Sequence, residues 1–152
     1  MTQIATGLDE LRALAGTDLG ASDWFEVTQD RVNLFADATE DRQWIHTDPE
    51  RAAEGPFGGA IAHGYLTLSL LIPLFNELLE VRGVRMSVNY GLEKVRFPSP
   101  VRVGGKIRLL GTVDSVQDVA GDGVQMALSF TIEIEGVTNP ACVAKALYRH
   151  YA

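Results

Sequence analysis

The second half of the chain alternates between apolar and polar positions, the pattern of half-buried β-strands. Apolar side chains at every second position predict strands over Val84–Leu92, Ile107–Val113, Val124–Ile134 and Ala141–Tyr151. After Leu92 the alternation continues at Val95 and Phe97, one residue out of phase, which predicts a β-bulge near Glu93-Lys94. At about 3.3 Å per residue, strands of this length are long enough to curve around a helix that lies across them.

The first half of the chain instead repeats its apolar side chains at helical spacing. The stretch from Leu8 to Ala15 predicts a helix near the start of the chain. A second helix is predicted around Val32 to Ala38, with Thr28 as an imperfect N-cap. A short strand within residues 23–28 is expected to lead into this second helix.

The segment from Ala62 to Glu80 differs, because its apolar residues surround almost the whole circumference of a helix. Such a helix is expected to be buried on all sides. Pro73 lies inside it and, lacking an N–H, leaves the carbonyl of Ser69 without its helical partner. We therefore expect this helix to bend or break at Pro73, at a cost of about 3 kcal/mol unless packing compensates.

One buried central helix wrapped by a long, curved antiparallel sheet accounts for all the predicted elements, which places the chain in the α+β class. No repeat, low-complexity tract or linker interrupts the sequence. Residues 1–152 are therefore interpreted as a single domain, the usual arrangement for a chain of this length.

Composition and charge exclude several classes of function. Lys and Arg number 13 against 20 Asp and Glu, and the resulting net charge of −7 would repel a nucleic acid. The longest nearly apolar stretch, Tyr65 to Phe75, is much shorter than the roughly 20 residues of a membrane-spanning helix. The single cysteine, Cys142, makes neither an intrachain disulfide nor a cysteine-based zinc cage, and it is interpreted as a buried, inert thiol. We expect a cytoplasmic protein with no nucleic-acid or membrane partner.

Two proton-handling side chains occur in the stretch ATEDRQWIHTDPERA, which starts at Ala38. On a continuous helix Asp41 and His46 would point about 140° apart, so the chain must leave the helix after Ala38 for them to face one cavity. In such a turn, Trp44 and Ile45 would anchor the loop in the core. A carboxylate and an imidazole that share a cavity can move protons through a bound water, whereas a turn residue and a hydrogen-bonded loop histidine are the alternative.

Small residues from Gly58 to Gly64 lead directly into the predicted central helix. Backbone N–H groups around Gly64 would lie at the helix N-terminus without an intrahelical partner, where a ligand can approach them closely. Donors of this type stabilise a developing oxyanion, and the loss of one typically costs about 3 kcal/mol of transition-state stabilisation. Together with Asp41 and His46, they predict a reaction centre.

These residues resemble two motifs of the MaoC-like dehydratases and (R)-specific enoyl-CoA hydratases. The places of the hydratase-2 signature are occupied by Phe35, Asp41, Ile45, His46 and Ala52. Residues 62–64, Ala-His-Gly, resemble the second block of the family at the head of its central helix, and the similarity covers roughly residues 25 to 110.

Three positions depart from the usual signature of that family. Glu40 stands in place of glycine, Gln43 in place of asparagine and Trp44 in place of proline. The variant resembles the nodulation-protein-N-like branch and the mycobacterial 3-hydroxyacyl-thioester dehydratases. The departures therefore bear on the choice of substrate more than on the Asp41-His46 pair.

The resemblance implies a hot-dog fold, a homodimer and an acyl thioester of coenzyme A or acyl carrier protein in a tunnel near the subunit interface. Asp41 and His46 would bind one water that adds to a trans-2-enoyl thioester, or would dehydrate an (R)-3-hydroxyacyl thioester in reverse. The Gly64 N–H would bind the thioester oxygen, Ser69 is a further substrate-binding candidate, and no metal or redox cofactor is implied. His63 would either contact the substrate or fix the loop at the helix entry, and we favour the second role.

Other functions remain as alternatives. A metal site is conceivable from Asp41, His46, Asp48 and His63, although only one further histidine exists and no His-Glu-x-x-His motif occurs. A serine hydrolase is disfavoured because no serine lies in a Gly-x-Ser-x-Gly elbow. A hot-dog acyl thioesterase would share the fold and substrate class, and a non-catalytic acyl-thioester-binding protein would not need the Asp41-His46 pair.

Overall fold

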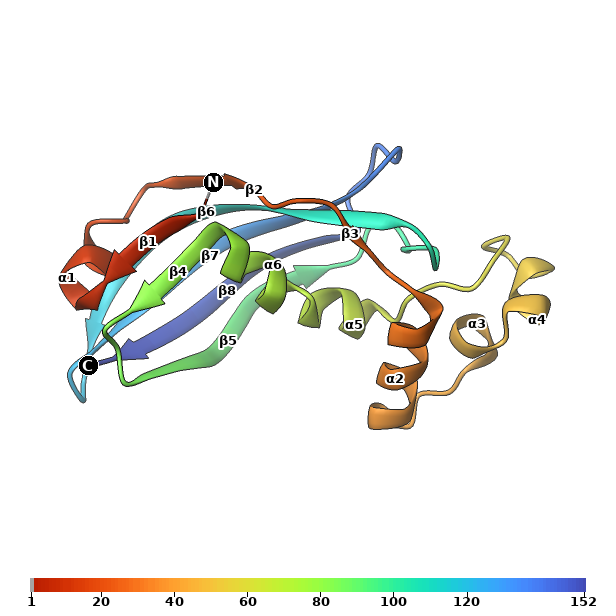
Figure 1. Cartoon of the computed structure of the whole chain (residues 1–152), viewed down its shortest axis with the longest axis horizontal. Coiled ribbons are helices and arrows are strands. Elements are labelled where there is room, and N and C mark those ends of the chain that lie inside the picture. The colour runs from red at the N-terminus through yellow and green to blue at the C-terminus, as the bar shows by residue number, and fades with distance from the viewer. Residues whose placement is uncertain (1) are drawn as a thin grey trace.

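The computed structural model describes residues 2–152 and consists of a long, curved sheet around a helix that is broken in the middle (Figure 1). The strands are β1 Gln3–Thr6, β2 Asp18–Ala21, β3 Phe25–Glu26, β4 Leu79–Arg82, β5 Met86–Arg96, β6 Lys106–Val119, β7 Gly123–Ile134 and β8 Cys142–Tyr151. The helices are α1 Gly7–Arg12, α2 Gln29–Thr39, α3 Trp44–Thr47, α4 Pro49–Ala53, α5 Gly64–Ser69 and α6 Leu71–Leu78. The expected α+β class is confirmed.

The main sheet has the order β2-β6-β7-β8-β5, with β3 also paired with β6, and all its pairings are antiparallel. A smaller sheet pairs β1 with β4 in parallel. The register of β5 against β8 shifts between Leu92 and Lys94, which confirms the predicted bulge. A second shift, between Asn89 and Gly91, was not predicted.

The core lies between the concave face of the sheet and the helices α5 and α6. Alternate side chains of β7 and β8 are buried there, and Phe75 of α6 packs on Phe130 and Tyr148 of the two strands. Cys142, at the start of β8, is buried as expected, and burial raises the pKa of its thiol to about 11. The thiol is therefore protonated at neutral pH and is a poor nucleophile.

The central helix breaks at Leu70, three residues before Pro73. Pro73 is the third residue of α6, in the first turn, where a backbone N–H has no intrahelical acceptor. The prediction of a break is thus confirmed, and the missing N–H of Pro73 removes no hydrogen bond from α6.

The expectation that this helix is buried on all sides is wrong for the single chain. Tyr65 is 73% exposed, and Ser69 and Ile72 are exposed on the same helix pair. The neighbouring strand β5 is also open, because it pairs with β8 along one edge and with no described strand along the other. An apolar helix face and a free strand edge therefore lie next to each other.

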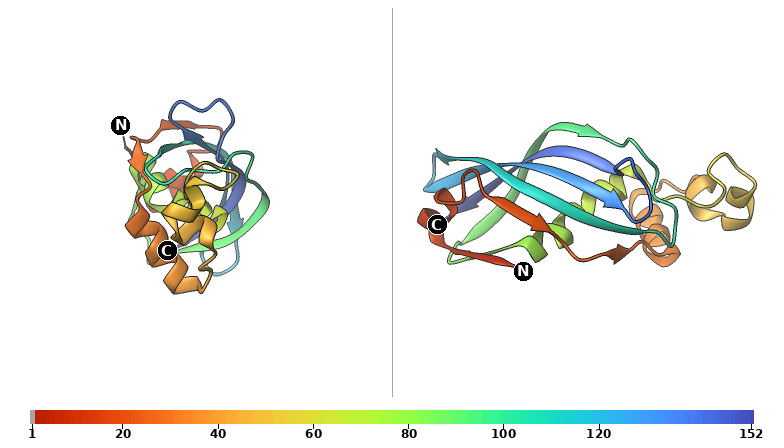
Figure 2. Two further views of the ribbon diagram at one scale, coloured as in Figure 1. Left: turned by 90° about the vertical axis from the view of Figure 1, so that its right-hand side faces the viewer. Right: turned by 90° about the horizontal axis from the view of Figure 1, so that it is seen from above.

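The helices α2, α3 and α4 extend beyond one end of the sheet, next to the start of α5 (Figure 2). The hydroxyl of Thr28 accepts a hydrogen bond from the N–H of Arg31, which confirms the predicted N-cap of α2. This extension carries Asp41 and His46. No helix in the described part of the chain is long and apolar enough to cross a membrane.

Candidate active site

The turn after α2 sets the direction of Asp41. Helix α2 ends at Thr39, and Glu40 adopts the left-handed conformation with φ 62° and ψ 17°. The Asp41 N–H then points to the Thr39 hydroxyl, with 3.5 Å between the nitrogen and Oγ1. Asp41 therefore lies in the turn after α2, and His46 lies on the short helix α3. The two residues are not on one continuous helix, on which they would point about 140° apart.

His46 is 7% exposed and is held by a backbone carbonyl. Its Nδ1 lies 2.7 Å from the carbonyl oxygen of Ile61. Because a carbonyl can only accept, Nδ1 carries the proton, and the neutral ring keeps a lone pair on Nε2. The side chain of Gln29 on α2 donates to the His46 carbonyl at 2.8 Å, which fixes α3 against α2.

The pKa of His46 lies below its ordinary value, chiefly because burial disfavours the charged ring. The Ile61 carbonyl opposes this shift, neighbouring His63 adds to it, and the Asp41 carboxylate opposes it as the smallest influence. His46 is therefore neutral at pH 7, with Nε2 available to accept a proton.

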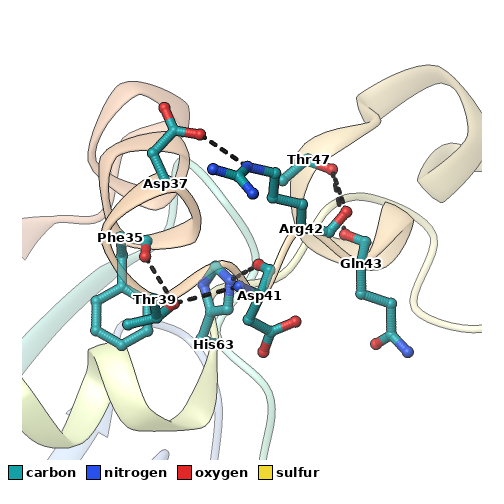
Figure 3. Close-up of polar contacts among 8 residues, drawn as sticks. All are labelled: Phe35, Asp37, Thr39, Asp41, Arg42, Gln43, Thr47 and His63. Carbon is teal, nitrogen blue, oxygen red and sulfur yellow. Dashed lines mark hydrogen bonds and ion pairs between the residues drawn. The ribbon is translucent and has the colours of Figure 1, made fainter.

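His63 stacks on His46 and connects the Asp41 turn to the start of α5. The two ring centroids are 3.8 Å apart, with 21° between the ring planes. The Nε2–H of His63 donates to the Asp41 carbonyl at 2.8 Å, and Phe35 lies against the ring with centroids 4.9 Å apart (Figure 3). This arrangement supports the interpretation that His63 fixes the loop.

The Asp41 carboxylate extends beside His63 in Figure 3, and Asp41 itself is exposed. Asp41, His46 and His63 each offer a polar side-chain atom within 4.8 Å of the others. One water can therefore contact both the Asp41 carboxylate and the His46 ring. This juxtaposition is what general acid–base chemistry requires.

The four-residue metal site considered above does not form. Asp48 instead caps α4, where its Oδ1 accepts from the Arg51 N–H at 3.1 Å. The other three residues, Asp41, His46 and His63, do keep potential ligand atoms within 4.8 Å of one another. The rings of His46 and His63 are, however, stacked nearly parallel, and Nδ1 of His46 is engaged by the Ile61 carbonyl. The Nε2 of His63 is moreover engaged by Asp41. These ligands are a poor fit to a tetrahedral zinc site.

A cavity of about 270 Å³ opens beside His46 at the start of α5. It is lined by His46, Phe57, Ile61, Ala62, Gly64, Thr67, Phe97, Ser99, Pro100, Val101 and Ala141. Thr67 is a residue that sequence reasoning missed, although its position three residues after Gly64 places both on one helix face. Its side chain is buried at the wall of the cavity.

Gly64 begins α5, where an N–H has no intrahelical acceptor. A Cβ built at Gly64 would lie 3.3 Å from the Phe97 ring, so a larger residue would press on the cavity wall. Gly64 itself lines the cavity, so the cavity adjoins the first backbone N–H of α5.

Ser69 lies apart from Asp41 and His46. Its hydroxyl donates to the Tyr65 carbonyl at 2.7 Å, and it lines a different cavity between α5–α6 and the strands β5 and β8. The structure therefore does not bring Ser69 to the cavity that holds His46.

Trp44 and Ile45 are half-buried, and the expectation that they anchor the loop in the core is wrong. The Arg51 guanidinium lies over the Trp44 ring at 4.3 Å, and a Cβ at Gly55 would be 3.0 Å from that ring. Trp44 therefore packs on α4 and the turn after it, while His46 is the buried residue of α3.

Comparison with known proteins relates the chain to a family. A family model described as "MaoC like domain" matches residues 10–133. The 3-hydroxyacyl-thioester dehydratase Z of Mycobacterium tuberculosis strain H37Rv is 52% identical over 143 residues, covering 94% of this chain and 95% of that protein. Nodulation protein N of Rhizobium meliloti is 44% identical over 139 residues, covering 90% and 86%.

Solved structures show the same fold at lower identity. The monoamine oxidase regulatory protein from Archaeoglobus fulgius superposes with a TM-score of 0.78 at 22% identity, covering 100% of this chain and 99% of that one. An (R)-hydratase from A. caviae gives a TM-score of 0.68 at 24% identity, covering 88% and 94%. The fold is thus the α+β hot-dog fold, as the resemblance implied. By its sequence and the extent of the match, the chain belongs to the MaoC-like dehydratase family.

Proposed function

We propose that this protein catalyses the reversible hydration of trans-2-enoyl thioesters to (R)-3-hydroxyacyl thioesters. The observation that carries the proposal is the Asp41 carboxylate beside the neutral His46 ring, next to a cavity that begins at Gly64. The relative that is 52% identical is named for the dehydration of 3-hydroxyacyl thioesters, which is the same reaction in reverse.

In the hydration direction, one water binds between the Asp41 carboxylate and Nε2 of His46, both of which are hydrogen-bond acceptors. The water oxygen forms the new bond to C3 of the enoyl group, and one of its protons passes to this pair. A proton from the pair is delivered to C2, so the enzyme returns to its starting state. Asp41 is the proposed base, with His46 orienting the water and moving the proton.

The backbone N–H of Gly64 is the proposed donor to the thioester oxygen. As water adds to C3, negative charge develops on that oxygen in an enolate-like transition state, and a fixed N–H stabilises it. The thioester itself acidifies C2, so the proposed chemistry uses no metal or redox cofactor. Coenzyme A or acyl carrier protein supplies the thiol of the substrate.

We further propose a homodimer that forms across β5. The free edge of β5 is an unpaired row of N–H and C=O groups, which natural proteins usually cover. Apolar side chains are exposed along β5 and on the adjoining helix, among them Met86, Tyr90, Leu92 and Tyr65. Pairing of two β5 edges would continue the sheet and cover the open helix face.

To test the proposed function, purified protein is incubated with crotonyl-CoA. Hydration is measured as the loss of the absorbance of the conjugated thioester. Asp41→Asn and His46→Gln are each expected to lower kcat by about 10²- to 10⁴-fold, the usual contribution of a general acid or base. Asp37→Asn is the matched control, because Asp37 is an exposed carboxylate on α2 paired with Arg42. Near-normal turnover in either site variant would remove that residue from the mechanism.

The same assay separates the two alternatives. A thioesterase would release free coenzyme A thiol without hydrating the double bond, which a thiol reagent detects directly. A non-catalytic binding protein would leave crotonyl-CoA unchanged while still binding it. The proposed hydratase consumes the double bond and releases no thiol.

A further inference from the structure

The cavity beside His46 has a mostly apolar wall. Among the described side chains that line it, those of His46, Thr67 and Ser99 carry a polar group. His46 and Thr67 are 7% and 2% exposed, whereas Ser99 is half-buried. An acyl thioester in this cavity would therefore meet two deeply buried polar side chains, and the mechanism proposed above uses only His46.

The hydroxyl of Thr67 is bonded differently from other hydroxyls on the helices. Those of Thr39, Thr47 and Ser69 each donate to the backbone carbonyl four residues earlier, at 2.7 to 3.2 Å. The carbonyl four residues before Thr67 belongs to His63, and it accepts the Thr67 N–H at 3.1 Å. Within residues 2–152, the Thr67 hydroxyl has no such bond to its own helix or to a neighbouring element.

A hydroxyl that is taken out of water without a new partner destabilises the folded state. Native proteins rarely keep such a group unless a bound water or a ligand completes its hydrogen bonds. The cavity is the space beside Thr67 in which that partner can bind. Valine has a similar branched shape and a similar helix propensity and would avoid the cost, so the threonine indicates a ligand with a hydrogen-bonding group.

The position of Thr67 on α5 brings its side chain close to the start of the helix. Helical side chains point toward the N-terminus and cover the preceding turn. Thr67 follows Gly64 by three residues, so its side chain leans over the turn whose first N–H belongs to Gly64. Both residues line the same cavity. One acceptor atom in that cavity can therefore lie within reach of both donors.

We infer that the Thr67 hydroxyl donates a hydrogen bond to the thioester oxygen of the substrate, as a second donor beside the Gly64 N–H. The inference rests on the proposed function, because it takes an acyl thioester as the ligand of this cavity. A carbonyl oxygen has two lone pairs and can accept both bonds. As negative charge develops on this oxygen, both bonds strengthen, so Thr67 contributes to the rate as well as to binding.

The first test compares crotonyl-CoA hydration by Thr67→Val and Thr67→Ser. Valine lacks the hydroxyl, and kcat is expected to fall about 10²- to 10³-fold, the usual effect of losing one oxyanion donor. Serine keeps the hydroxyl and should retain most of the activity. Thr131→Val is the matched control, because Thr131 lies between the buried residues Phe130 and Ile132 of β7 and so points to the opposite face of the sheet. Wild-type turnover in Thr67→Val overturns the inference.

The melting temperature separates this role from a structural one. Thr67→Val removes a buried hydroxyl that has no partner in the free protein, so the variant is expected to melt at the same temperature as the wild type or higher. A clear fall in the melting temperature would show that the hydroxyl has a partner within the protein, and it would overturn the inference.

Binding measurements identify the atom that Thr67 contacts. Butyryl-CoA carries the thioester oxygen, the thioether S-butyl-CoA lacks it, and neither can be hydrated. By calorimetry, the wild-type protein is expected to bind butyryl-CoA at least about fivefold more tightly, the usual net effect of one hydrogen bond. Thr67→Val should reduce this preference.

Equal binding of the two compounds by the wild type, or binding of neither, overturns the inference. An unchanged preference in Thr67→Val does so even if hydration falls, because the hydroxyl would then act on the water and not on the thioester oxygen. Hydration of crotonyl-CoA by the wild-type protein reports on the proposed function alone, since the binding comparison involves no reaction.

Discussion

At the scale of single residues, the environment of His46 determines how the site responds to pH. Two contacts act on the ring: the Ile61 carbonyl fixes its tautomer, and His63 is stacked on its face. Burial and His63 lower the pKa of His46. We therefore expect full activity at about pH 6.5 and above, and a loss of activity only at lower pH, where the ring becomes protonated. The rate of crotonyl-CoA hydration against pH measures this acid limb.

Replacement of His63 is expected to move that limb. His63→Gln can keep the hydrogen bond to the Asp41 carbonyl but removes the neighbouring imidazole that lowers the His46 pKa. The His46 pKa should therefore rise, and the acid limb of kcat/KM should shift to higher pH. A limb that stayed in place or moved to lower pH would show that His63 has only a structural role.

The lowered His46 pKa also has a consequence for stability. The unfolded chain, with an ordinary histidine pKa of about 6.5, binds a proton more readily than the folded one. The contribution of His46 to stability is therefore complete above about pH 6.5 and declines as the pH falls through the folded-state value.

The sequence was sufficient to predict that Asp41 and His46 must leave the helix, because helical geometry alone separates them. It was not sufficient to place His63 against His46, since these residues are far apart in the chain and meet only when α5 docks on α3. Thr67 is similar: its spacing from Gly64 places both on one helix face, but only the folded chain shows that this face lines the cavity beside His46.

At the scale of elements, the end of α2 carries a backbone conformation that favours glycine. Glu40 has φ 62°, which costs a residue with a side chain about 1–2 kcal/mol. Glu40→Gly removes this cost but adds freedom to the unfolded chain, so we expect a net gain of about 0.5 kcal/mol in the free energy of unfolding. Urea denaturation measures it.

The control for this prediction is Glu40→Ala. Alanine removes the carboxylate but keeps a Cβ in the left-handed conformation, so it should not share the gain seen with glycine. Equal stabilisation by both substitutions would assign the effect to the lost charge instead of to the backbone.

The position of Pro73 leads to a second prediction at this scale. Since Pro73 lies in the first turn of α6, Pro73→Ala restores an N–H that has no intrahelical acceptor, and the free energy of unfolding should change by less than about 1 kcal/mol. By contrast, Leu74→Ala, at the fully buried next position, should cost about 2–5 kcal/mol. A large gain from Pro73→Ala would mean that Pro73 strains the helix.

Most strands and the bulge of β5 could be predicted because the two-residue period is local. The pattern predicts the break at Pro73, whereas the helix breaks at Leu70, three residues earlier. The missing N–H of Pro73 does not show where the first turn of a new helix begins. The open face of α5 and α6 could not be foreseen, because apolar residues around a helix do not reveal whether a strand or a second subunit covers them.

At the scale of the whole molecule, the proposed homodimer predicts that the exposed helix face is covered in solution. Tyr65→Glu places a charge on that face and should shift the protein from dimer to monomer in analytical ultracentrifugation. Val137→Glu is the matched control, because Val137 is 47% exposed in the loop between β7 and β8, and this loop projects on the opposite side of the view from β5 (Figure 1). Wild-type protein that sediments as a monomer would contradict the proposal.

The interruption at Leu70 divides the central helix into two short pieces that border different cavities. The first piece, from Gly64 to Ser69, borders the cavity beside His46, while the second, from Leu71 to Leu78, borders a separate cavity together with β5 and β8. Backbone hydrogen bonds from Leu70 to Leu66 and from Leu74 to Leu70 keep the two pieces joined. Because the pieces face separate cavities, a substitution on α6 can reshape the second cavity without changing the α5 residues beside His46.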